Sequence, residues 1–129
     1  MAFFFTTQEL IHSDYAEKHN IDNTPETFVI RVNLEYLKSV LDLVRAHVDS
    51  PIIVNSGYRC PCLNKAVGGV ENSLHLKGRA ADIRFVGPAL MDKAYSFLNR
   101  NRKQLDIAEL VRYENFLHVG VNEPPTVVL

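Results

Sequence analysis

Two histidines and an aspartate have the residue types and the spacing that suit a metal site. His75 and Asp82 lie seven positions apart in SLHLKGRAAD, and His118 follows in FLHVGV. Gly78 can adopt a positive φ, so the chain can turn back and bring the first two side chains together. Two histidines, one carboxylate and an open fourth position are the components of a catalytic zinc site. The alternative is that each is an ordinary surface, packing or ion-pair residue.

The elements that would carry two of these residues are short strands. AADIRF (80–85) and NFLHVGV (115–121) both alternate between apolar and other residues. Successive side chains point to opposite faces of a strand, so Asp82 and His118 each lie opposite an apolar face. If the two strands are neighbours, both side chains face the same cleft.

The remaining pattern indicates an α+β protein. A capping box at 6–9 opens a short helix, apolar residues at helical spacing predict a helix over 33–47, and a short helix can begin at Pro61. We expect a second long helix at 88–99 and strands at 52–55, 80–85, 107–113 and 115–121. The prediction is a small antiparallel sheet with flanking helices.

Length and charge narrow the function classes. A chain of 129 residues predicts one domain, 1–129. The formal net charge of −1 provides no field that would draw nucleic acid or an anionic membrane to the protein. The opening MAFFFTTQEL has neither a basic leader nor a signal-length apolar core, and no apolar run is long enough to span a bilayer. We therefore expect synthesis in the cytoplasm.

The cysteines do not suit a structural role. Cys60 and Cys62 are separated by one residue, so a disulfide between them would be strained. The chain has no second cysteine pair for a structural zinc site. We expect free thiols rather than metal ligands.

Several ordered motifs resemble one enzyme family. SLHLKGRAAD matches the S-x-H-x-x-G-x-A-x-D signature of the zinc D-Ala-D-Ala carboxypeptidase family, which includes phage endolysins. SGYRCPCLNKAVGG resembles that family's S-G-Y-R-S-P-x-x-N-x-x-V-G-G segment, and FLHVGV resembles its W-x-H strand. The similarity covers almost the whole chain. It implies the D-Ala-D-Ala carboxypeptidase/hedgehog-like fold, with a zinc site on the sheet.

The resemblance also implies roles for individual residues. His75, Asp82 and His118 would bind one zinc ion. Arg59 would hold or polarise the substrate near the scissile carbonyl, with Ser73 and Tyr58 also at the substrate. Family members hydrolyse peptide bonds at or next to D-alanine in bacterial cell-wall peptides, with zinc activating water and a glutamate as general base.

The general base is the least defined of these assignments. In the family it commonly lies three residues before the last histidine, where this chain has Asn115. Glu114 is one residue further back, and strict alternation from His118 places it on the His118 face. Glu109, on the preceding strand, is the rival. A solvated turn glutamate is the alternative for either residue.

The resemblance leaves three functional interpretations. The first is a zinc peptidase acting on peptidoglycan stem peptides, as a D,D-carboxypeptidase or an endopeptidase, reaching the wall by a route such as phage lysis. The second is a zinc-bearing binding module without a competent base, and the third is a phage structural protein on the same fold. The other histidines, His12, His19 and His47, lie outside the motifs and are expected at the surface or in packing.

Overall fold

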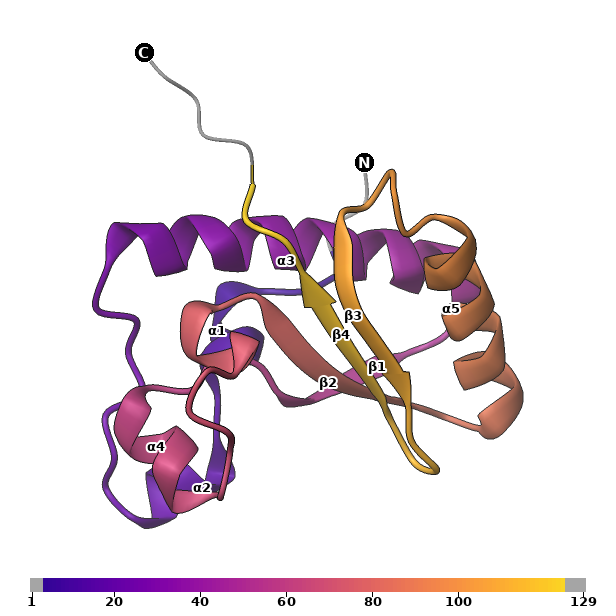
Figure 1. The fold of residues 1–129 in the computed structure, drawn as a ribbon. Helices are drawn as coiled ribbons and strands as arrows, with labels where there is room; N and C mark the ends of the chain where they lie inside the picture. The colour runs from indigo at the N-terminus through magenta and orange to yellow at the C-terminus, as the bar shows by residue number, and fades with distance from the viewer. Residues whose placement is uncertain (1–3, 125–129) are drawn as a thin grey trace.

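An antiparallel sheet of four strands, in the order β1-β2-β4-β3, forms the centre of the computed structural model, which describes residues 4–124 (Figure 1). The strands are β1 (Ile52–Ser56), β2 (Ala80–Phe85), β3 (Ile107–Arg112) and β4 (Leu117–Val121). This arrangement confirms the predicted α+β class with a small antiparallel sheet. The expected domain limits also include residues 1–3 and 125–129, which lie outside the described part.

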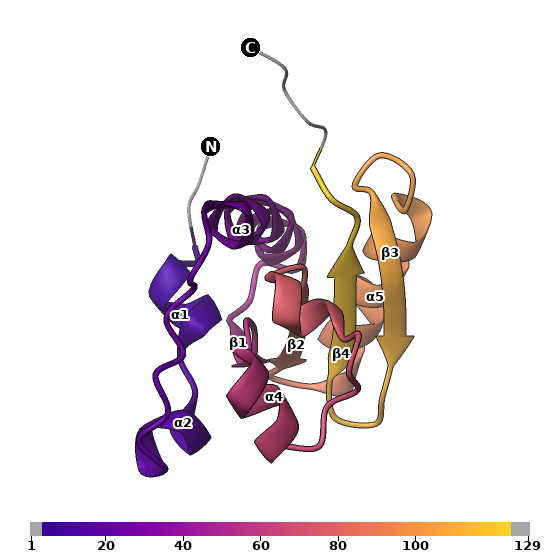
Figure 2. The same cartoon turned by 60° about the vertical axis from the view of Figure 1, so that its left-hand side comes forward.

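Helices flank this sheet on both sides. They are α1 (Thr7–Ile11), α2 (Asp14–Lys18), α3 (Phe28–Val48), α4 (Pro61–Ala66) and α5 (Pro88–Arg100), with a 3₁₀ helix, η1, at Leu74–Lys77. In Figure 2, α5 lies behind β3 and β4, and α4 lies in front of the sheet. No helix among residues 4–124 has both the length and the apolarity needed to cross a membrane.

Local sequence signals set several helix ends. The capping box predicted at 6–9 is present, with Thr6 and Glu9 bonding each other's backbone N–H groups. The long helix α3 begins at Phe28, five residues before the predicted start, and is capped by the side chain of Thr27. Phe28 is 77% exposed. Apolar residues that face solvent do not follow the buried stripe, so the periodicity misses this first turn.

One core joins the long helices to one face of the sheet. It includes Leu34, Leu37, Leu41 and Val44 of α3, Met91 and Leu98 of α5, and Ala81, Ile83, Leu117, Val119 and Val121 of the strands. The strand members are the residues predicted to form the apolar faces. Their burial leaves the opposite face of β2 and β4 to the polar residues.

Helix α3 also supports the segment that carries His75. Gly78 ends η1 with a left-handed φ of 69°, as the sequence predicted. A Cβ at this position would meet the carbonyl oxygen of Ile30 at 3.0 Å. The side-chain amide of Asn33 donates to the carbonyl of Lys77 at 2.9 Å. The turn between η1 and β2 is therefore held closely against α3.

A buried asparagine positions the other segment near the site. The Asn23 amide donates to the carbonyls of Ile11 and Tyr58, at 2.8 and 2.9 Å, and its oxygen accepts from the Cys60 N–H at 2.7 Å. Buried polar groups are stable when paired in this way. Asn23 thus ties α1 to the segment that presents Arg59.

Candidate metal centre

The structure brings His75, Asp82 and His118 together. Asp82 and His118 are Cα partners on the neighbouring strands β2 and β4. His118 Nδ1 lies 2.8 Å from Asp82 Oδ1, and His75 Nε2 lies 3.4 Å from Asp82 Oδ2. The two imidazole rings are 5.3 Å apart, centroid to centroid. Both nitrogens therefore approach one carboxylate from different elements.

The orientation of His75 is set by its backbone and by a neighbouring carbonyl. The Ser73 hydroxyl caps η1 by accepting from the His75 N–H at 3.1 Å. His75 Nδ1 lies 2.7 Å from the carbonyl oxygen of Gly57. A carbonyl only accepts hydrogen bonds, so Nδ1 is the protonated nitrogen of the neutral ring. Nε2, the nitrogen facing Asp82, is then free to bind a metal.

The metal-free cluster is electrostatically coupled. Burial tends to raise the pKa of Asp82, but hydrogen bonds with His118 and His75 outweigh it and hold this pKa well below its usual range. The bond to Asp82 raises the pKa of His118, burial opposes the rise, and the bond to Glu109 adds to it. Asp82 therefore stays ionised at neutral pH, and a metal must displace a proton that His118 holds more firmly than usual.

The same three residues fit a single cation. Each can offer one ligand atom, and the three atoms lie within 4.8 Å of one another. Histidine nitrogen and aspartate oxygen are ligand types that suit Zn²⁺, at about 2.0 to 2.2 Å. His75 is buried, whereas Asp82 and His118 are partly exposed, so the cluster can be approached from solvent.

Arg59 also lies at the cluster. Its Nη2 atom is 3.6 Å from Asp82 Oδ2, and its Nε and Nη1 donate to Ser56 and Asn64 at 3.0 and 3.2 Å. Burial lowers the pKa of the guanidinium, and Asp82 opposes this change. The group keeps its charge at neutral pH. Ser56, Asn64 and the Asp82 carboxylate therefore hold the positively charged Arg59 guanidinium at the edge of the site.

The other residues assigned from the sequence have different surroundings. Ser73 directs its hydroxyl to the His75 N–H, as described above. Tyr58 is buried and lines two pockets. Ser56 and Arg59 line one of these pockets as well. Cys60 is a buried free thiol that caps α4, and Cys62 is an exposed free thiol, so neither belongs to the candidate metal group.

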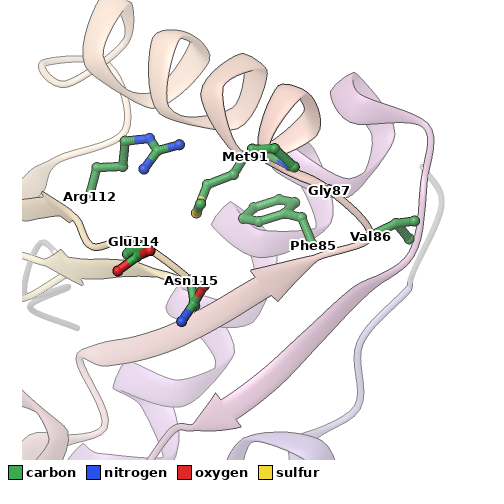
Figure 3. Close-up of a pocket in the computed structure, with 8 residues that line it drawn as sticks. Phe85, Val86, Gly87, Met91, Arg112, Glu114 and Asn115 are labelled. Carbon is green, nitrogen blue, oxygen red and sulfur yellow. The ribbon is translucent and has the colours of Figure 1, made fainter.

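The structure does not bring Glu114 to the cluster. Glu114 is exposed in the bend between β3 and β4 and lines a pocket with Phe85 and Met91 (Figure 3). The predicted strand from Asn115 begins only at Leu117, so strict alternation from His118 does not extend back to Glu114. Glu109 instead approaches the site, with Oε1 2.7 Å from His118 Nε2.

The histidines outside the motifs are not part of the group formed by His75, Asp82 and His118. His12 is exposed and contacts Asp14 at 2.8 Å. His19 stacks on Tyr15, and His47 stacks on Phe97. These positions agree with the predicted surface and packing roles.

The fold and the donor set define a class of site. Two histidines and one aspartate that converge from η1, β2 and β4 are a donor set typical of a hydrolytic metal centre. A family model described as Peptidase M15 matches residues 4–120. The chain therefore belongs to the Peptidase M15 family, which confirms the resemblance inferred from the motifs.

One curated relative matches a short segment. A zinc D-Ala-D-Ala carboxypeptidase from Streptomyces albus G is 51% identical over 35 residues, which are 27% of this chain. The aligned segment spans 14% of the length of that relative.

Proposed function

We propose that this chain is a zinc peptidase that hydrolyses peptide bonds at or next to D-alanine in the stem peptides of bacterial peptidoglycan. The observation that carries the proposal is the convergence of His75, Asp82 and His118 beside Arg59 in a member of the Peptidase M15 family. The name of the Streptomyces albus G relative supports the D-alanine substrate class. The two histidines and the aspartate would hold one zinc ion per chain.

The chain's own residues would bind and orient the substrate. A bound zinc ion supplies Lewis acidity and lowers the pKa of water. Arg59 presents a fixed, charged donor next to the metal ligands, where it can hold a carbonyl or carboxylate oxygen as negative charge develops. A pocket lined by Ser56, Tyr58 and Arg59 lies beside this donor and would receive part of the substrate.

Proton transfer requires a further group. Glu109 contacts the ring of His118, so it acts on a proposed ligand rather than at the open side of the cluster. Glu114 lies one residue before the position at which the family commonly has its base, and its proposal as general base rests on that proximity in sequence alone. Because neither glutamate has a defined place as general base, a second candidate is a zinc-bearing protein on this fold that binds its target without cleaving it. Such a protein would be a binding module or a phage structural component.

Digestion of purified muropeptides distinguishes the two functions. The zinc-loaded protein is incubated with monomeric and cross-linked muropeptides, and the products are weighed by mass spectrometry. Loss of one terminal D-alanine indicates a carboxypeptidase, whereas conversion of cross-linked dimers to monomers indicates an endopeptidase. His75→Ala should abolish either reaction. His47→Ala serves as the control, because His47 stacks on Phe97 and is not part of the candidate metal group. Intact muropeptides that nevertheless bind the zinc-loaded protein would support the non-catalytic function.

A further inference from the structure

The His118 ring lies between two carboxylates. Nδ1 faces Asp82 at 2.8 Å, and Nε2 faces Glu109 at 2.7 Å. Glu109 is not part of the candidate metal group, which consists of His75, Asp82 and His118. It therefore contacts the nitrogen on the side of the ring away from the proposed metal.

A bulge in β3 directs Glu109 to this face. Ile107 is paired with Val121, but Glu109 is already paired with Gly120, so Ala108 is an extra residue in β3. With regular alternation, Glu109 would share the core face with Ile107, which is buried. The extra residue shifts the alternation by one position, as β-bulges do, and turns Glu109 to the side of His118.

The facing strand leaves room for the carboxylate. Gly120 on β4 is the partner of Glu109. A Cβ on Gly120 would lie 2.9 Å from Glu109 Oε1 and 3.1 Å from Glu109 Cβ. Such distances are too short for ordinary carbon contacts, so a larger residue at position 120 would displace the Glu109 side chain.

The two histidines are supported in the same way. Each directs one nitrogen at Asp82 and the other at an oxygen acceptor, the Gly57 carbonyl for His75 and the Glu109 carboxylate for His118. An acceptor on the outer nitrogen fixes the tautomer and the ring orientation, and it makes the inner nitrogen a stronger ligand.

We infer that Glu109 is a positioning residue that holds His118 with Nε2 protonated and Nδ1 available to the metal. This inference rests on the proposed function only for the identity of the metal ligands. An ordinary surface ion pair is the alternative, since the Glu109 side chain is 46% exposed. Such a pair would contribute little to stability and nothing to metal affinity.

Zinc affinity separates these two explanations. The dissociation constant is measured by competition with a chromogenic chelator for the wild type, Glu109→Ala, Glu109→Gln and the control Glu35→Ala, which removes an exposed α3 carboxylate paired with Lys38. Glu109→Ala should weaken zinc binding roughly 10- to 100-fold with an unchanged Tm. Glu109→Gln should show a smaller loss, because its amide oxygen still accepts a hydrogen bond.

A second measurement does not depend on zinc or on catalysis. Long-range ¹H–¹⁵N spectra of the metal-free protein at alkaline pH report the share of His118 rings that carry the proton on Nε2. This share should fall in Glu109→Ala, because Asp82 still accepts at Nδ1. The inference is overturned if Glu109→Ala leaves both the zinc dissociation constant and the His118 tautomer unchanged. It is also overturned if Glu109→Gln binds zinc more weakly only because its Tm has fallen, since the loss then reflects folding and not the orientation of His118. If the Glu109 variants behave as expected but the zinc-loaded wild type leaves muropeptides intact, the inference stands and the proposed peptidase function is contradicted.

Discussion

Asp82 and His118 are Cα partners in the antiparallel pair of β2 and β4, and their side chains meet at 2.8 Å on the face opposite the core. Directly opposed residues in an antiparallel pair share a face, so backbone pairing alone brings these two groups together. His75 completes the cluster from η1, a separate segment. Two of the three groups therefore come from paired strands, and the third comes from a turn that packs against α3.

Removing any one of the three proposed ligands should remove the metal. His75→Ala, His118→Ala and Asp82→Asn are expected to purify without stoichiometric zinc, because two remaining protein ligands do not complete a zinc site. Metal content per chain is measured by plasma mass spectrometry, and His19→Ala is the control on an exposed histidine. Full zinc occupancy in any of the three variants would show that the ligand set is assigned incorrectly.

Zinc affinity should depend on pH through His118. Its metal-free pKa is raised, chiefly by the bond to Asp82, and only the unprotonated ring can bind zinc. The dissociation constant should be constant above this raised pKa. Below it, affinity should fall about tenfold per pH unit as a proton competes with the metal. Chelator competition from pH 5 to 9 tests this, and a dissociation constant that stays flat until well below the usual histidine pKa would contradict it.

The role of Glu114 can be separated from metal binding. If Glu114 is the general base, Glu114→Gln should keep full zinc occupancy and lower kcat about 10²- to 10⁴-fold on a cleaved muropeptide. Glu109→Gln should act mainly through zinc affinity, so added zinc should restore most of its kcat. Steady-state kinetics at saturating zinc compare the two variants. If Glu114→Gln retains wild-type kcat, the base is a different group.

Replacing Arg59 with the other long cationic residue, lysine, should impair catalysis. Arg59→Lys keeps the charge but loses the planar donors that contact Ser56, Asn64 and Asp82. Loss of one oriented donor to developing charge costs about 3 kcal/mol, so kcat/KM should fall roughly 100-fold while zinc content and Tm are maintained. Unchanged kinetics would place Arg59 outside the substrate site.

Gly78 should matter for packing as well as for backbone conformation. Both Gly78 and Gly68 have a positive φ, but a Cβ on Gly68 meets nothing within 4 Å, whereas one on Gly78 meets Ile30 and Leu34 of α3. Gly68→Ala should lower the free energy of unfolding by about 1 to 2 kcal/mol through strain alone. Gly78→Ala should cost more, and it should also weaken zinc binding by displacing His75. Equal losses in denaturant titrations would show that the contact with α3 is unimportant.

The sequence by itself determined the features that follow from local rules. Alternation in AADIRF and FLHVGV placed Asp82 and His118 opposite an apolar face, because side-chain direction in a strand has a period of two. The capping box at Thr6 and the positive φ at Gly78 were also predicted from residue type. Spacing singled out His75, Asp82 and His118, and the resemblance to the family added Arg59; the structure brings these four residues together.

Only the tertiary structure decided which glutamate approaches the histidines. The bulge at Ala108 depends on how β3 pairs with β4, and a one-residue shift in pairing moves a side chain to the other face. Alternation counted along one strand cannot include this shift, so it gave Glu109 no defined position. It placed Glu114 on the His118 face because the strand was expected to begin at Asn115, whereas β4 begins at Leu117. The Gly57 carbonyl that orients His75 comes from a segment 18 residues away, which no local pattern relates to it. Contacts between segments, rather than residue types, therefore set the protonated nitrogen of each histidine.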